Sequence, residues 1–111
     1  MGYRFVFTAW FDRDMKLLAK HNTGFRTDFE TFLQVFDPLA HPVIPGSGGA
    51  RKARMPAKGR GKRGGYRVVY YFFKDDVVWL ITMYDKVRKE DLSPADTRQI
   101  TRLIDEIRQR S

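Results

Sequence analysis

Two neighbouring runs of β-branched and aromatic residues constrain the fold of this chain more than any other feature. Residues 65–73 and 77–84 each have the composition of a β-strand, and the short segment Lys74-Asp75-Asp76 separates them. Strands joined by so short a turn pair as an antiparallel hairpin. Apolar side chains occur on both faces of this hairpin, so we expect helices against one face and partial cover of the other.

The sequence before the hairpin predicts one strand and then two helices. Residues 3–10 are rich in aromatic and β-branched side chains, which indicates a strand. Asp12 is expected to cap a short helix after it, and the T-x-x-E pattern of Thr27 and Glu30 is typical of a second helix N-terminus. Phenylalanine recurs at helical spacing over residues 25–36, which predicts a helix with a buried aromatic stripe.

Two further elements complete the expected fold. Residues 50–57 predict a strand that carries basic side chains, and Ser93 followed by Pro94 is the preferred opening of a C-terminal helix. The element order is therefore β-α-α-β-β-β-α. We expect one α+β domain over residues 1–111, with an antiparallel or mixed sheet of about four strands packed against two N-terminal helices and a C-terminal helix.

Composition excludes several classes of protein. The 111 residues are 42% hydrophobic and 14% aromatic, which favours one folded domain over a disordered chain. The absence of cysteine excludes disulfides and thiolate metal sites, and His21 and His41 lack neighbouring ligand residues, so we expect no metal and no cofactor. The apolar runs are too short for a secretory signal or a membrane span, which predicts a cytoplasmic protein without a membrane partner.

Positive charge is concentrated in one segment. The formal net charge is +8, and residues 51–67 contain eight of the 21 basic residues and no acidic one, so the remaining 13 basic residues equal the 13 acidic residues in number. A patch of one sign is the electrostatic signature of a protein that binds a polyanion. The alternative is a solvated loop that keeps the chain soluble.

The glycines of this segment match a nucleotide motif only by letter. Gly59, Gly61 and Gly64 spell G-x-G-x-x-G, but the dinucleotide motif must follow a strand and open a helix, whereas here a strand follows. The Walker motif also fails, because Lys62 is followed by Arg63 instead of Ser or Thr. We therefore expect no nucleotide cofactor.

Strand periodicity predicts that several cations share one surface. Side chains two residues apart lie on the same face of a strand, so Lys52 and Arg54 share one face and Arg67 and Tyr71 share a face of the next strand. If the two faces coincide, these four side chains converge, and Lys86 borders the same surface from the end of the last strand. Fixed cations beside an aromatic ring suit an RNA strand, whose phosphates and bases they would contact.

Four stretches of the chain resemble the RelE/ParE toxin superfamily, and its HigB-like branch most closely. They are IPGSGGARKAR at 44–54, GRGKRGGYRVVYY at 59–71, YDK at 84–86 and DLSP at 91–94. The resemblance implies the toxin of a type II toxin–antitoxin system, a ribosome-dependent mRNA endonuclease. Its implied partners are the ribosome with its rRNA, mRNA, and a cognate antitoxin that often carries a helix-turn-helix domain.

The resemblance points to the same four cations as the strand periodicity, namely Lys52, Arg54, Arg67 and Lys86. Metal-free cleavage of RNA needs a base for the 2′-OH, stabilisation of charge on the phosphoryl oxygens, and a proton for the departing 5′ oxygen. Arginine stays protonated, so Arg54 and Arg67 are expected to stabilise the phosphate. Crowding by like charges disfavours the ammonium form, so Lys52 or Lys86 is a candidate base or proton donor.

Tyrosines and other basic residues are weaker candidates. Tyr71 is included among the catalytic candidates, and Tyr84 is another, although packing within the sheet is the better explanation for either ring. Six basic residues are expected to bind RNA or the ribosome: Arg51, Lys58, Arg60, Lys62, Arg63 and Arg88. Two other functions stay open, a ParE-like inhibitor of DNA gyrase and an RNA-binding module without catalysis.

Overall fold

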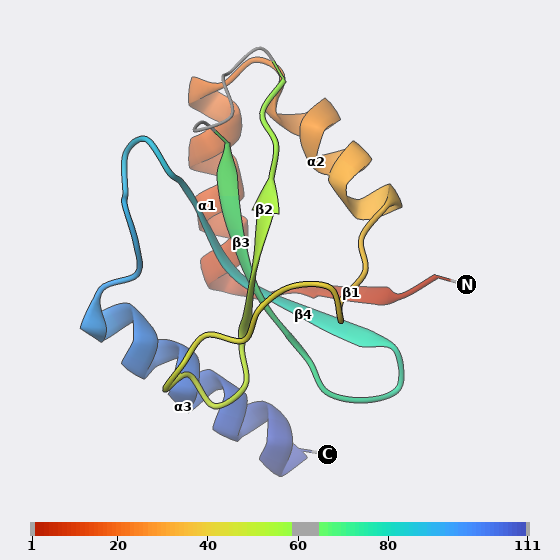
Figure 1. Ribbon diagram of the computed structural model, residues 1–111, viewed down its shortest axis with the longest axis vertical. Coiled ribbons are helices and arrows are strands. Elements are labelled where there is room, and N and C mark those ends of the chain that lie inside the picture. The colour runs from red at the N-terminus through yellow and green to blue at the C-terminus, as the bar shows by residue number, and fades with distance from the viewer. Residues whose placement is uncertain (1, 59–64, 111) are drawn as a thin grey trace.

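The computed structural model describes residues 2–58 and 65–110. The described residues form helices and strands in the predicted order, β-α-α-β-β-β-α (Figure 1). The strands are β1 (Arg4–Phe7), β2 (Arg51–Met55), β3 (Tyr66–Phe72) and β4 (Val77–Asp85). The helices are α1 (Ala9–His21), α2 (Phe25–Gln34) and α3 (Pro94–Arg110). The predicted α+β class is confirmed, with two helices before the hairpin and one after it.

The four strands form one mixed sheet in the order β1-β4-β3-β2. Strand β3 pairs antiparallel with both neighbours, which confirms the predicted hairpin of β3 and β4. Asp75 and Asp76 close this hairpin with φ angles of 57° and 56°, a left-handed conformation that Asp tolerates better than most residues. Strand β1 pairs parallel with β4, and α1, α2, β2 and β3 lie between them in the chain.

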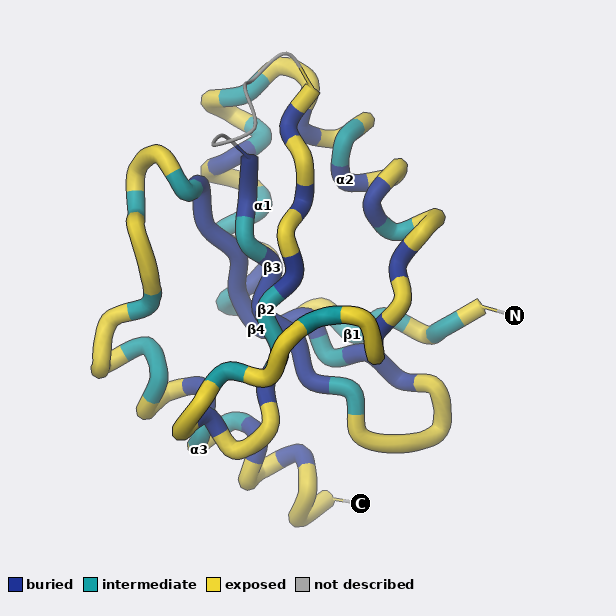
Figure 2. The backbone as a smooth tube through the Cα atoms, in the orientation of Figure 1, coloured by how far each residue is buried: buried dark blue, intermediate teal, exposed yellow. Residues whose placement is uncertain are grey.

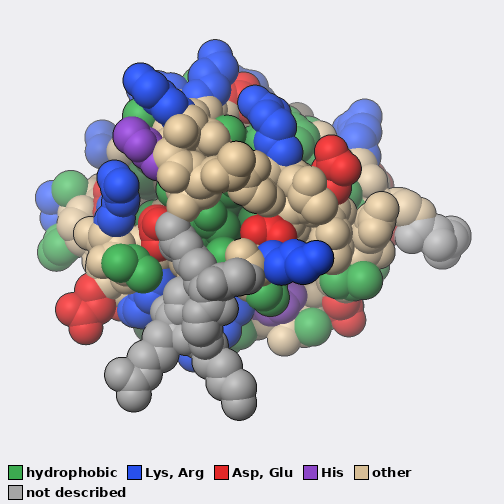
Figure 3. Space-filling view, turned by 90° about the horizontal axis from the view of Figure 1, so that it is seen from above, with side chains coloured by type: hydrophobic (Ala, Val, Ile, Leu, Met, Phe, Trp, Pro, Cys, Tyr) green, Lys and Arg blue, Asp and Glu red, His purple; other side chains and the backbone are tan. Residues whose placement is uncertain are grey.

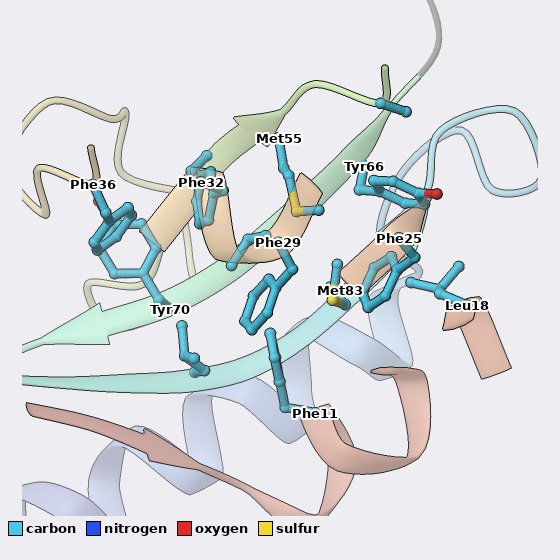
Figure 4. Close-up of a cluster of buried hydrophobic side chains, with 14 of the residues drawn as sticks. Phe11, Leu18, Phe25, Phe29, Phe32, Phe36, Met55, Tyr66, Tyr70 and Met83 are labelled. Carbon is cyan, nitrogen blue, oxygen red and sulfur yellow. The ribbon is translucent and has the colours of Figure 1, made fainter. Parts of the chain in front are cut away.

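Two separate clusters of apolar side chains bury the two faces of the sheet. The phenylalanine stripe of α2 packs with α1 and one face of the sheet, as Figure 4 shows for Phe29 beside Phe11 and Phe25. Tyr70 of β3 joins this cluster and donates a hydrogen bond from its hydroxyl to the Pro38 carbonyl (2.6 Å). The second cluster lies under α3. The predicted aromatic core is therefore confirmed, and it covers the whole length of α2.

Helix α3 covers only part of its face of the sheet. The second cluster joins Val69, Tyr71 and Ile81 of the sheet to Ile100 and Ile104 of α3. Figure 1 shows α3 crossing the sheet at one end, while the C-terminal end of β2 and the start of β3 extend well past it. Figure 2 shows that β3 and β4 are nonetheless buried along most of their length. The open end of this face is where charged side chains are accommodated.

Two of the predicted helix starts are wrong, and one is confirmed. Thr8 caps α1 in place of Asp12, because its Oγ1 accepts a hydrogen bond from the Phe11 N–H (3.1 Å) and also donates one to the Ile81 carbonyl (2.8 Å). A hydroxyl that both caps the helix and bonds to β4 stabilises this helix start more than a purely local cap would. Ser93 caps α3 as predicted, accepting from the Asp96 N–H (3.0 Å).

Helix α2 also begins earlier than its sequence pattern predicts. It starts at Phe25, with Gly24 as the N-cap, so Thr27 and Glu30 lie inside the helix and form no capping box. The Phe25 ring is buried and packs edge-on against Tyr66, with 5.3 Å between the ring centroids. This packing stabilises a helix that begins at Phe25. Packing of the aromatic stripe thus outweighs the local capping pattern.

Gly65 shapes the chain where it enters β3. Its φ angle is +108°, and a Cβ atom at this position would lie 2.8 Å from the Met55 carbonyl oxygen of β2. Its own carbonyl accepts a hydrogen bond from the Lys86 N–H (3.1 Å), so it also ties the end of β4 to the start of β3. A residue without a side chain is required here for both conformational and steric reasons.

We predict that Gly65→Ala lowers the free energy of unfolding by more than about 2 kcal/mol, because strain and a backbone clash add up. Gly46→Ala is the matched control: Gly46 also has a positive φ (+74°), but a Cβ there meets nothing within 4 Å. The control should lose about 1 kcal/mol. Urea unfolding followed by circular dichroism measures both, and equal losses would contradict the role assigned to the Met55 contact.

Candidate functional site

Strand register brings three of the predicted cations onto one face. Arg54 of β2 lies opposite Arg67 of β3, and Arg67 in turn lies opposite Tyr84 of β4. Lys52 lies opposite Val69, whose side chain packs under α3, so all these side chains project from the α3 face of the sheet. We call Lys52, Arg54, Arg67 and Lys86 the cationic cluster.

The cationic cluster occupies the end of the face that α3 leaves open. Arg54 is exposed, and Lys52, Arg67 and Lys86 are half-buried. The Lys86 Nζ donates to the Glu90 carbonyl, which turns this side chain toward the loop that connects β4 to α3. Seen from this end of the molecule, basic side chains occur at several places of the surface with acidic ones between them (Figure 3). The cluster thus combines access to solvent with fixed positions.

Asp91, in the loop before α3, connects the cluster to a tyrosine. Its Oδ1 accepts hydrogen bonds from the Leu92 N–H (2.8 Å), the Lys52 Nζ (3.2 Å) and the Tyr84 hydroxyl (3.4 Å). The Leu92 N–H, helped by the charges of Lys52 and Lys86, holds the pKa of the Asp91 carboxyl below its usual value. Asp91 is therefore an ionised carboxylate held against the cluster.

Tyr84 is the tyrosine that meets the cations. Its side chain is 6% exposed, and burial, followed by the charge of Asp91, raises its pKa to about 12, whereas Arg67 opposes this shift. The phenol is therefore neutral at physiological pH, and donates a hydrogen bond instead of acting as a base. The Lys89 Nζ lies over the ring, 5.7 Å from its centroid, so the ring face also meets positive charge.

Tyr71 does not join this group, so the predicted convergence is wrong for this residue. It lies on the same face as Arg67 but further along β3, where α3 covers the sheet. Its ring is 5% exposed and stacks on Phe73 with a centroid distance of 5.8 Å. Gly49 approaches it from the other side, since a Cβ there would lie 3.3 Å from the ring. Tyr71 is a packing residue of the second cluster.

The predicted binding residues lie at several different places. Arg51 is on the opposite face from Lys52 and donates to the His41 carbonyl (2.6 Å), so it fixes the segment before β2. Lys58 is exposed next to α2, where its N–H donates to Asp28 (3.1 Å). Arg88 is exposed after β4, beside a cavity of about 220 Å³ on the α1 side. Three predicted binding residues lie outside the described residues: Arg60, Lys62 and Arg63.

Sequence reasoning missed Asp91 as a site residue and ranked Tyr84 below Tyr71. Asp91 lies in an irregular loop, and nothing in its neighbouring sequence indicates that the loop folds back onto β2. The alternation of side chains along β4 would have placed Tyr84 on the same face as Lys86. Choosing Tyr84 over Tyr71 as the tyrosine of the site, however, requires the register across β3 and the position of α3. Both are properties of the folded chain.

No protein-family model matches the chain. Within the described residues, no group of three or more His, Cys, Asp or Glu side chains is arranged to hold a metal ion. None of the helices in the described ranges is long and apolar enough to cross a membrane. The interpretation of the site therefore rests on its own geometry and on the sequence motifs.

We predict that Asp91→Asn lowers the pKa of Tyr84 from about 12 toward its usual value, because it removes the negative charge that opposes ionisation. In the unsubstituted protein the unfolded chain loses this proton first, so the free energy of unfolding should fall as the pH rises from about 10 to about 12. The tyrosinate absorbance of each protein, minus that of its Tyr84→Phe counterpart, measures the shift.

Asp105→Asn, on an exposed position of α3, is the control and should leave the Tyr84 titration in place. Circular dichroism recorded along the titration identifies the pH at which the fold itself is lost. An unchanged Tyr84 titration in Asp91→Asn would show that the carboxylate does not act on the phenol.

Proposed function

We propose that this protein is the toxin of a type II toxin–antitoxin system and cuts mRNA on the ribosome. The observation that carries the proposal is the row Arg54, Arg67 and Tyr84, held in register across three strands on the open end of the sheet. Lys52 and Lys86 flank this row. The resemblance of its motifs to the RelE/ParE superfamily, and to the HigB-like branch within it, supports the same function.

The proposed reaction is an attack of a ribose 2′ oxygen on the adjacent phosphorus. The bond from phosphorus to the 5′ oxygen breaks, which leaves a 2′,3′-cyclic phosphate on one fragment and a 5′-hydroxyl on the other. Negative charge builds on the phosphoryl oxygens during this step. Arg54 and Arg67 provide two planar guanidinium groups that donate to such oxygens, and each is worth about 3 kcal/mol by comparison with other oxyanion donors.

The proton transfers are assigned to the residues around Asp91. Its ionised carboxylate, which lies against Lys52, is proposed to accept the proton of the 2′-OH, while the ammonium of Lys52 or Lys86 supplies a proton to the departing 5′ oxygen. Neutral Tyr84 donates a hydrogen bond to the same carboxylate. Asp91 and Tyr84 thus act in the protonation states that their surroundings favour.

The ribosome is proposed to provide what this open surface lacks. Cleavage needs the 2′ oxygen, the phosphorus and the 5′ oxygen nearly in line, and a shallow cationic face alone does not impose that geometry on a flexible strand. mRNA held by the ribosome arrives already ordered. The isolated protein is accordingly expected to cut free RNA poorly.

We predict that Arg67→Ala slows mRNA cleavage by about 100-fold, because it removes one phosphate donor from the transition state. Arg102→Ala, which removes an exposed arginine from α3, is the matched control and should cleave at the normal rate. The assay incubates each protein with translating ribosomes and maps new mRNA ends by primer extension. Circular dichroism checks that both variants fold.

Three outcomes would contradict the proposal. Full cleavage by Arg67→Ala would show that the phosphate lies elsewhere. An unsubstituted protein that produces no new mRNA ends but inhibits supercoiling by DNA gyrase would be a ParE-like inhibitor. A protein that binds RNA tightly and leaves it intact on the ribosome would be a binding module without catalysis.

A separate prediction concerns Lys62 and Arg63, which belong to the basic run but not to the cationic cluster. Replacing both by Gln should weaken binding to ribosomes and reduce the slope of log K against log salt by about 1 for each charge lost, since fewer counterions are released. The cleavage rate at saturating ribosome concentration should change little. A large loss of that rate with unchanged binding would place these residues in the chemical step instead.

A further inference from the structure

A cavity of about 540 Å³ lies between α2 and the outer edge of β2. Its walls include Thr31 of α2 and Val35, the C-cap residue of that helix, on one side and Arg54 and Pro56 on the other. Val35 is 78% exposed, which is high for a large apolar side chain. Of these four residues the proposed RNA cleavage uses only Arg54, so the apolar part of the cavity needs a separate explanation.

The strand edge beside the cavity is open for backbone pairing. Strand β2 is the last strand of the sheet, and its Lys52 N–H points away from β3, where it donates to the Pro42 carbonyl (3.1 Å). Because these directions alternate along a strand, the N–H and C=O of Arg54 also point outward. The segment that covers the edge pairs at Val43 with Arg51 and reaches no further along β2 within the described residues.

The cavity suits an aliphatic side chain better than a nucleobase. Recognition of a splayed base requires an exposed ring face on which the base can stack. Phe32 and Phe36, which form the floor, are only 7% and 8% exposed, and Phe36 is already stacked on His41 at 5.7 Å. What the cavity offers instead are methyl groups, those of Val35 and Thr31 above all.

The charged side chains around the cavity determine which charge an occupant should carry. Arg54 and Lys58 are both exposed on its β2 side. Asp28, the carboxylate in its wall, already accepts a hydrogen bond from the Lys58 N–H (3.1 Å). The net field at the open edge is therefore positive, and an occupant with acidic side chains is favoured over a basic one.

We propose that the open edge of β2 and this cavity bind an extended acidic segment of a partner protein. The segment adds a short strand through the backbone of Arg54, inserts an aliphatic side chain against Val35, and places carboxylates near Arg54 and Lys58. Backbone pairing provides affinity and the cavity provides specificity, as in other cases of strand addition. The docking site does not depend on nuclease activity, but an acidic segment bound there would engage Arg54 and so reduce its availability to RNA.

The test selects short random peptides displayed on phage against the immobilised full-length protein. Enriched peptides should alternate aliphatic and acidic residues. In solution, Val35→Glu should weaken binding of the best synthetic peptide by about tenfold or more, because it places a carboxylate in the cavity. Leu17→Glu introduces the same charge at another exposed apolar side chain, 59% exposed on α1, and should stay within about twofold of the unsubstituted protein.

A second measurement tests strand addition itself. N-methylation of the peptide, one residue at a time, should abolish binding at alternate positions, since only every second N–H of an added strand faces β2. Failure to enrich peptides, equal effects of Val35→Glu and Leu17→Glu, or N-methyl effects without alternation would each overturn the proposal. Weaker binding of single-stranded RNA to Val35→Glu, with peptide binding unchanged, would assign the cavity to RNA.

Discussion

The register of β3 between β2 and β4 is the constraint on which the rest of this structure depends. Side chains of β3 alternate between two buried clusters, Tyr66 and Tyr70 facing the phenylalanines and Val69 facing α3. A slip by one residue would carry Arg67 into the phenylalanine cluster without a partner, at a cost of several kcal/mol. Burial on both faces therefore fixes where Arg67 emerges, and with it the row of side chains across three strands.

A polar contact from α1 lies beside the irregularity that sets which residues of β4 reach that row. The pairing of β3 with β4 shifts between Val69 and Tyr70, and nearby the Asp14 Oδ2 accepts hydrogen bonds from the Thr82 hydroxyl (2.5 Å) and the Met83 N–H (3.2 Å). Burial raises the pKa of Asp14 although both bonds oppose the shift. Beyond this contact Met83 enters the phenylalanine cluster and Tyr84 turns to the opposite face. The irregularity thus pairs Tyr84 with Arg67.

Features that depend on nearby residues could be predicted from the sequence, and features that depend on distant contacts could not. The hairpin, the aromatic stripe of α2 and the Ser93 cap each follow from a short stretch of residues. The cap of α1 is Thr8 and not the predicted Asp12, because the Thr8 hydroxyl also bonds to β4. The alternation of side chains along the strands predicted that Arg54 and Arg67 lie on one face of the sheet. The burial of Tyr71 on that face could not be predicted, because it depends on where α3 packs.

The proposed function makes this surface a site of RNA cleavage in which the ribose itself supplies the nucleophile. The most direct test places a single 2′-deoxynucleotide at the cleaved position of an mRNA and repeats the reaction on ribosomes. Cleavage at that position should disappear, while the all-ribose mRNA should yield a fragment ending in a 2′,3′-cyclic phosphate. Continued cleavage of the substituted mRNA at the same bond would contradict the proposed function.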